Sequence, residues 1–284
     1  MADPMKFFTD GDAYERMMGR WSRTVGEKFL HWLAPAEGLH WLDVGCGNGA
    51  FTEVLMHHCA PAKIDAVDPS SEQIFHAQSR TTGNIAAFQV GDAQALPFSE
   101  RIFDVAVMAL VIAFVPDARK GVSEMARVVR PGGAIATYMW ESTAGDSIPQ
   151  APFKRAAEAL GFGGKRVLPP SGKLTTQEGL RNLWREAGLE KIETTRIDIN
   201  VEFDSFDGFW QSNTELPMPA TAFLRELPPS DVQKVRDWLD EHLPRNAAGR
   251  ISYGAYANAV KGQVAVSEVL PNQRRGVSVL SGLL

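Results

Sequence analysis

Cysteine is scarce in this chain, with Cys46 and Cys59 the only two among 284 residues. Two cysteines do not supply the disulfide framework of a small secreted domain, so we expect a fold held by its core in a reducing, cytoplasmic compartment. Long apolar runs are also missing, because the longest, residues 105–115, falls short of the roughly 20 residues that span a bilayer. No apolar core of a signal peptide follows the first residues. We therefore expect a soluble protein with no membrane span.

An excess of basic charge is missing too. Lys and Arg number 29 against 34 Asp and Glu, which gives a net charge of −5. A nucleic-acid partner is not expected, because binding the phosphate backbone needs a basic field. Hydrophobic residues make up 44% and charged residues 22%, an ordinary globular composition. A small-molecule partner is expected instead, and monomer and homodimer both stay open.

Short apolar runs alternate with helical patterns through the first half of the chain, which is typical of a parallel sheet covered by helices. We expect strands at 39–44, 63–68, 85–90, 102–109 and 134–140, and helices at 50–59, 70–80 and 117–129. The pattern predicts an α/β fold. Its Rossmann-like, doubly wound sheet is mostly parallel, with an antiparallel last strand and a helical lid or insertion.

The second half changes character and suggests how the chain is divided. We expect an N-terminal helical lid (1–36), a Rossmann-like core (37–141), a loop-rich cap insertion (142–176), a C-terminal part that completes the sheet (177–266) and a poorly ordered tail (267–284). Within these parts the pattern predicts helices near 153–160 and at 177–187, strands at 192–203 and 251–264, and a helix opened by a capping box at Ser230–Gln233.

The segment after the first expected strand is rich in glycine. Gly45, Gly47 and Gly49 allow a tight turn and a close approach of the backbone to a ligand. The helix that follows offers free N–H groups to an anion. The pattern Gly45-x-Gly47-x-x-Ala50 also satisfies the relaxed dinucleotide fingerprint, with Asp68 where the ribose acid belongs. An NAD(P)-dependent oxidoreductase is therefore the alternative enzyme class.

Three further features separate the two interpretations. Asp43 lies two residues before the first glycine, where a carboxylate disfavours a pyrophosphate but suits a ligand with an ammonium group. Another acid, Asp92, follows the third expected strand, and Pro131-Gly132-Gly133 precedes the fifth. With this ordered set, residues 39–140 resemble the class I S-adenosylmethionine-dependent methyltransferases. Within that class, the resemblance is to the broad group of the ubiquinone/menaquinone-biosynthesis enzymes.

The resemblance implies S-adenosylmethionine as cofactor, S-adenosylhomocysteine as product, and a role for each motif. Asp43 would engage the methionine ammonium, directly or through water, Asp68 would accept both ribose hydroxyls, and Asp92 would accept from the adenine amine. The other implied cofactor residues are Tyr14 and Arg20 at the methionine carboxylate, Gly45, Gly47, Asn48 and Gly49 in the loop, Pro69, Gly91 and Ala93 around the adenine, and Ala109 near the sulfonium.

Methyl transfer from a sulfonium is an in-line displacement whose cofactor already carries the activated methyl, so alignment and exclusion of water are the main tasks. No residue stands out as the catalytic base. Similar enzymes often carry a histidine after the fourth strand, where this chain has Ala113, which suggests an apolar wall. Tyr138 and Glu141, at the end of the fifth strand, are candidates to orient or deprotonate an acceptor; packing and solvated roles are their alternatives.

We therefore expect a metal-independent methyltransferase for a small, lipophilic or aromatic acceptor. The N-terminal apolar residues and the insertion around Phe153 and Phe162 would line its pocket. His57-His58-Cys59 are adjacent on one helix and face different directions, so no zinc site is expected. The motifs of DNA amino- and protein arginine methyltransferases after the fourth strand are missing. A methyltransferase-like regulator that binds the cofactor stays open, and so does the acceptor atom.

Overall fold

The computed structural model describes residues 19–80, 85–143, 147–162, 172–215 and 220–266. Its strands are β1 (His40–Val44), β2 (Lys63–Asp68), β3 (Ala86–Val90), β4 (Phe103–Ala109), β5 (Val129–Trp140), β6 (Glu190–Phe203) and β7 (Ile251–Gln263). The described α-helices are α2 (Arg20–Leu33), α3 (Ala50–Cys59), α4 (Ser71–Arg80), α5 (Ala118–Val128), α6 (Ala151–Ala159), α7 (Gln177–Glu186), α8 (Phe206–Thr214) and α9 (Pro229–His242). Short 3-10 helices are η3 (Ile112–Phe114), η4 (Gly172–Thr175) and η5 (Ala222–Glu226).

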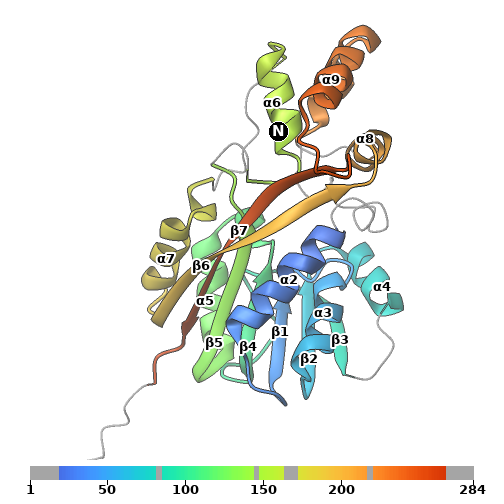
Figure 1. Ribbon diagram of the computed structural model, residues 1–284. Coiled ribbons are helices and arrows are strands. Elements are labelled where there is room, and N and C mark those ends of the chain that lie inside the picture. Colours follow the sequence, from blue (N-terminus) through green and yellow to red (C-terminus); the bar gives the residue numbers. More distant parts are fainter. Residues whose placement is uncertain (1–18, 81–84, 144–146, 163–171, 216–219, 267–284) are drawn as a thin grey trace, which may run out of the picture.

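All of these strands join in one sheet, in the order β3-β2-β1-β4-β5-β7-β6. The first five pair in parallel, whereas β7 runs antiparallel to both β5 and β6. Helices α2, α3 and α4 cover one face of the sheet, and α5 and α7 cover the other (Figure 1). The expected doubly wound sheet with an antiparallel last strand is confirmed.

The central strand β4 packs against helices on both of its faces. Val105 and Val107 belong to the core under α2 and α3, while Ala106 and Met108 belong to the core under α5 and α7. All four side chains are at most 3% exposed. A strand covered on both faces needs a continuous apolar run rather than alternation, and this explains its sequence.

The β6–β7 pair is much longer than the strands beside it. β6 has 14 residues, which extend about 46 Å at 3.3 Å per residue, whereas β1 has 5. Because Trp140, the last residue of β5, pairs with Ala257, the first six residues of β7 continue past the end of β5. Helices α6, α8 and α9 gather around this projecting part (Figure 1). We call these three helices the cap.

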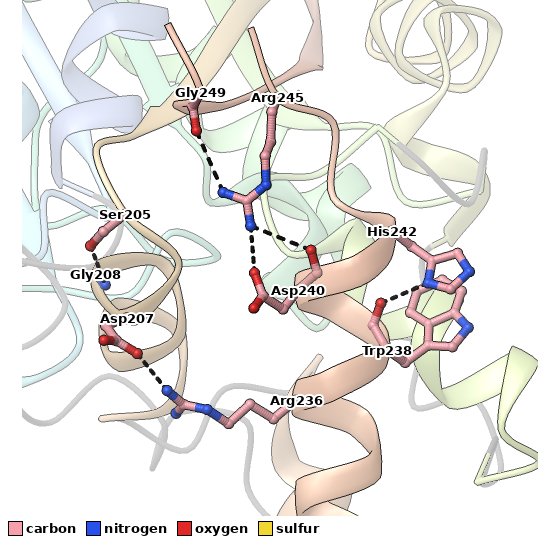
Figure 2. A network of polar contacts seen from close by, with 9 residues as sticks. All are labelled: Ser205, Asp207, Gly208, Arg236, Trp238, Asp240, His242, Arg245 and Gly249. Atoms are coloured by element: carbon pink, nitrogen blue, oxygen red, sulfur yellow. Dashed lines mark hydrogen bonds and ion pairs between the residues drawn. The ribbon is translucent and has the colours of Figure 1, made fainter.

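Polar contacts hold the connection from α8 through α9 to β7 (Figure 2). Ser205 caps α8 by accepting the Gly208 N–H at 3.1 Å. Arg236 on α9 forms an ion pair with Asp207 on α8, and the Arg245 guanidinium binds the Asp240 carboxylate. Of these contacts, the Arg236–Asp207 ion pair joins α9 to α8, and the Arg245–Asp240 pair joins the end of α9 to the segment before β7.

Two boundaries and one helix differ from the sequence expectation. β5 begins at Val129 rather than 134, because the Pro-Gly-Gly segment forms an irregularity inside the strand, between the Phe103–Val129 and Val105–Ala134 pairs. α9 begins at Pro229 with Pro228 as N-cap, so the expected capping box at Ser230 is wrong; proline suits a first helical position because it has no N–H to leave unpaired. Helix α8 was not expected at all.

Most other boundaries agree with the expectation to within two residues. At the start of α4 the Ser70 hydroxyl accepts the Gln73 N–H at 3.2 Å, while the Ser70 N–H donates to Asp68 Oδ1. The tail 267–284 and the first half of the expected lid, residues 1–18, lie outside the described residues. In the part of the chain that the structure describes, no helix combines the length and the apolar character needed to cross a bilayer.

Candidate functional site

The glycine loop joins the end of β1 to the start of α3. Gly45 has φ +78°, and a Cβ atom there would lie 2.6 Å from side-chain carbons of Val111, so only glycine fits without a shift. The Gly45 N–H donates to the Val67 carbonyl on β2 at 2.7 Å. Gly49, with φ +82°, is the N-cap of α3. The loop is thus fixed between the ends of β1, β2 and β4.

Asp68, the last residue of β2, ties the glycine loop to this strand. Its Oδ2 accepts the Gly47 N–H at 2.9 Å, and its Oδ1 accepts the Ser70 N–H at 2.9 Å. Burial raises the pKa of the carboxyl, and the two backbone hydrogen bonds oppose the rise. A carboxylate offers about four lone-pair positions, so Asp68 keeps capacity for further donors such as a diol.

Asp43 lies beneath the loop and is fully buried. The Thr52 hydroxyl on α3 donates to Asp43 Oδ2 at 2.7 Å. The other oxygen, Oδ1, has no hydrogen-bond partner among the described residues. Burial raises the pKa of the Asp43 carboxyl to about 7, the Thr52 hydrogen bond opposes this, and the nearby Asp68 carboxyl adds to it. A buried acceptor left unpaired is costly, so its place beside the loop points to a ligand donor.

Asp92 lies in the turn after β3. Its Oδ1 accepts the Gln94 N–H at 2.8 Å, and its side chain is exposed to solvent. The preceding Gly91 donates its N–H to the Asp68 carbonyl at 3.1 Å, which places the two acids on neighbouring strand ends. Ala93, the next residue, is partly exposed.

The end of β4 folds back toward the glycine loop. Leu110, directly after Ala109, has φ +62°, an unfavourable value for a bulky side chain, and its N–H donates to the Tyr138 carbonyl at 2.9 Å. The next residue, Val111, lies against Gly45. Strained backbone of this kind clusters at binding sites, and here it brings the end of β4 to the loop.

Tyr138 and Glu141, the two candidates at the end of β5, are both buried. The Tyr138 ring lies 4.7 Å from Phe29 on α2, within the core, which favours its packing alternative. Glu141 Oε1 accepts both the N–H and the hydroxyl of Thr143 at 2.6 Å, and its Oε2 accepts from the Tyr256 hydroxyl at 3.1 Å. Glu141 therefore joins the start of the insertion to β7.

The remaining expected residues lie in several places. Asn48 Oδ1 accepts the Ala50 N–H at 3.2 Å at the start of α3, and Pro69 is exposed next to Asp68. Tyr14 and the Arg20 side chain lie outside the described part of the chain. Among the described residues there is no group of three or more His, Cys, Asp or Glu side chains that could hold a metal ion.

Cys46, inside the loop, is buried against Ala66 and Ile74. Burial, with the nearby Asp43 and Asp68 carboxylates, raises the pKa of its thiol. A thiol that stays protonated is a poor nucleophile, so Cys46 serves packing in the loop.

Two contributors were missed by sequence reasoning. Thr52 looks like an ordinary residue of the first turn of α3, and Val111 like part of an apolar run. The signal for Thr52 was a hydroxyl in the helix that follows an acid and a glycine turn. Val111 gave no signal in the sequence, because its contact with Gly45, where a Cβ atom has no room, is visible only in the fold.

The comparisons with known proteins cover the part of the chain that contains these residues. A family model described as a methyltransferase domain matches residues 42–137, from the middle of β1 to β5. The O-methyltransferase resE of Aspergillus sclerotiorum is 30% identical over 205 residues, which cover 70% of this chain and 70% of resE. The chain belongs to the S-adenosylmethionine-dependent methyltransferases.

Other members of the family are similar to this methyltransferase over shorter or more divergent stretches. The O-methyltransferase cnsE of Penicillium expansum is 32% identical over 188 residues, 64% of this chain and 62% of cnsE, less than two thirds of its length. The ubiquinone/menaquinone biosynthesis C-methyltransferase UbiE of Dinoroseobacter shibae is 24% identical over 207 residues, 65% of this chain and 80% of UbiE. The expected resemblance to the ubiquinone/menaquinone-biosynthesis group is confirmed as a distant one, at 24% identity.

A solved structure shares the fold of the methyltransferase. Phosphoethanolamine N-methyltransferase 2 of Haemonchus contortus, in complex with phosphomonomethylethanolamine and S-adenosylhomocysteine, superposes with a TM-score of 0.54 and 17% identity. The match covers 90% of this chain and 57% of that one. At this identity the likeness shows the common architecture only.

Proposed function

We propose that this methyltransferase transfers the methyl group of S-adenosylmethionine to a small, lipophilic or aromatic acceptor by in-line displacement. The assignment of the cofactor rests on two acids next to the glycine loop, Asp43 and Asp68. Asp68 holds the Gly47 N–H and keeps acceptor capacity for the ribose, while Asp43 Oδ1 is buried without a partner where an ammonium would complete it. Both features fit a nucleoside that carries an amino-acid portion.

The cofactor would supply an activated methyl, so the chain's own task is to position it and exclude water. Asp43, Asp68 and Asp92 would hold the ammonium, the ribose and the adenine. Ala109 and the strained Leu110 would place backbone beside the reacting end, since they lead from β4 back to the loop. This chemistry requires neither a nucleophilic side chain nor a metal.

The cap supports an apolar acceptor. Phe153 on α6 stacks on Phe209 of α8 at 5.4 Å between ring centroids, and Phe203 meets Phe209 edge-on at 5.3 Å. These rings belong to the same apolar cluster as Trp21 on α2 and Trp140 at the end of β5. An acceptor between the end of β5 and the cap would therefore lie next to an aromatic cluster.

An oxygen acceptor is the first to test, because resE and cnsE are O-methyltransferases that match 70% and 64% of this chain. UbiE, a C-methyltransferase, is the reason to include phenols with a free ring carbon. The relatives' names support these choices only as starting points, since the cap, which would surround the acceptor, is the variable part of such folds.

The deciding experiment has two steps. Thermal unfolding is followed with S-adenosylhomocysteine, NADH or NADPH, and only S-adenosylhomocysteine is expected to raise Tm. Transfer of label from methyl-labelled S-adenosylmethionine is then measured over phenols, quinones, amines and carboxylates, with and without a chelator. Stabilisation by a nicotinamide cofactor instead would reject the proposal. Cofactor binding with no transfer to any acceptor would favour a regulatory role.

A further inference from the structure

The hydrogen bond between Thr52 and Asp43 makes the two oxygens of the Asp43 carboxyl different. A carboxylate has two equivalent oxygens, yet only one of these is engaged, by a hydroxyl from the first turn of α3. Both residues are fully buried, so solvent does not compete for either group. The single Thr52 proton therefore decides which oxygen of Asp43 stays available.

Thr52 is well suited to hold one orientation. Its β-branched side chain is stiff at χ1. A threonine inside a helix can donate its hydroxyl proton to a carbonyl three or four residues back along the same helix. Here the proton goes across to the neighbouring strand instead, over 2.7 Å. The hydrogen bond thus links α3, which begins at the glycine loop, to the acid below that loop.

We propose that Thr52 is a positioning residue for the cofactor: by occupying Oδ2 of Asp43, it aims Oδ1 at the ammonium of the methionine portion. This inference rests on the proposed function, because it assumes that S-adenosylmethionine occupies the loop. Thr52 touches Asp43 rather than the cofactor, so its contribution is confined to the amino-acid end of the ligand. The ribose and the adenine are held by other residues.

Two ligands that differ in the amino-acid portion separate its contribution to binding from that of the nucleoside. S-adenosylhomocysteine carries the amino-acid portion, whereas 5′-methylthioadenosine has the same nucleoside and sulfur without it. Calorimetric Kd values are measured for both with the wild-type protein and with Thr52→Val, which keeps the shape and removes the hydroxyl. We expect Thr52→Val to weaken S-adenosylhomocysteine roughly tenfold, as for one hydrogen bond to a charged group, and methylthioadenosine by less than about twofold.

Two further variants test positioning against simple packing. Thr52→Ser restores the hydroxyl and is expected to recover most of the lost affinity. Thr137→Val is the matched control, because Thr137 is also fully buried and donates its hydroxyl to the Met108 carbonyl at 2.6 Å, away from Asp43. It should leave the ratio of the two Kd values unchanged. If Thr52→Val does not fold, Thr52→Ala carries the same expectation.

A double-mutant cycle with Asp43→Asn completes the test. In the Asp43→Asn background, adding Thr52→Val should raise the Kd of S-adenosylhomocysteine by less than about twofold, because the two residues act as one unit. Additive losses, equal losses for both ligands, or wild-type affinity in Thr52→Val would each overturn the inference. If the wild-type protein binds neither ligand, the proposed function fails instead, so the two failures are distinct.

Discussion

The two ends of the sheet are built differently. From β3 to β5 the strands pair in parallel, the turns are tight, and polar groups at the strand ends meet one another through backbone hydrogen bonds. From β5 to β6 the strands are antiparallel and long, and the cap is assembled from aromatic side chains of α6, α8 and β6. The motifs of the first end follow rules of local spacing, whereas the cap depends on aromatic contacts such as Phe153–Phe209, which join residues 56 positions apart.

This difference suggests a division of work between the two ends. The parallel end would hold a constant ligand, the cofactor, and the antiparallel end would shape the site for a variable one, the acceptor. If the division holds, damage at one end should leave the other intact. The following variants and conditions probe that independence, from the largest expected effect to the smallest.

Replacing Phe209 with alanine should damage the cap alone. The side chain is fully buried between Phe153 and Phe203, so the free energy of unfolding should fall by about 3–5 kcal/mol. Chemical denaturation measures this loss, and calorimetry below the transition should give an unchanged Kd for S-adenosylhomocysteine. Phe209→Leu, which keeps much of the volume, serves as control. A parallel loss of cofactor affinity would show that the two ends are not independent.

Replacing Asp68 with alanine should abolish much of the cofactor affinity. Loss of two hydrogen bonds to a charged acceptor predicts a Kd roughly 100-fold higher for S-adenosylhomocysteine and for methylthioadenosine alike, since both carry the ribose. Asp65→Ala is the matched control on the same strand, because Asp65 pairs with His40 and Lys63 instead. Equal affinities for the two aspartate variants would argue against a ribose at Asp68.

Affinity for S-adenosylhomocysteine should rise with pH between 5.5 and 7. Burial raises the pKa of Asp43 to about 7, with the Asp68 carboxyl adding to the rise, so acid conditions neutralise the acceptor while the ligand ammonium stays charged. Binding then requires release of a proton, and Kd should improve by up to about tenfold per pH unit. Asp43→Asn should flatten the profile. A steep profile in that variant would assign the titration to another group.

The same raised pKa has a consequence for stability. The folded state holds a proton on Asp43 that the unfolded chain releases above pH 3.8, so this residue stabilises the fold most at low pH. That contribution is lost as pH rises through about 7. Comparing wild type with Asp43→Asn by denaturation at pH 5 and pH 8 isolates the contribution from the other acids.

Replacing Arg236 with alanine should have the smallest effect. Its guanidinium pairs with the largely exposed Asp207 and lies 5.3 Å from the ring centres of Phe206 and Trp210. Exposed ion pairs and cation–π contacts are weak, so we expect the free energy of unfolding to fall by less than about 1 kcal/mol. Arg236→Lys controls for charge. A loss as large as that of Phe209→Ala would mean that this polar network, not the rings, holds the cap.

The contrast also explains what the sequence could reveal. The glycine loop, the acids at the ends of β1, β2 and β3, and the continuous apolar run of β4 follow local rules, and their positions were predicted. Helix α8 was missed because its nine residues lack a strong apolar period, although Ser205 is a regular N-cap. The burial of Asp43 and its pairing with Thr52 depend on how α3 packs on β1, which no spacing reveals.

The described residues between Phe203 and Ile251, which form α8, η5 and α9, are inserted between the paired ends of β6 and β7. The antiparallel pairing of β6 with β7 runs from Glu190–Gln263 to Phe203–Ile251, where this inserted segment begins and ends. Replacing the segment therefore need not change the pairing of the parallel strands. A chimaera that grafts another segment between these strand ends should therefore be able to acquire a new acceptor preference while it inherits cofactor affinity unaltered.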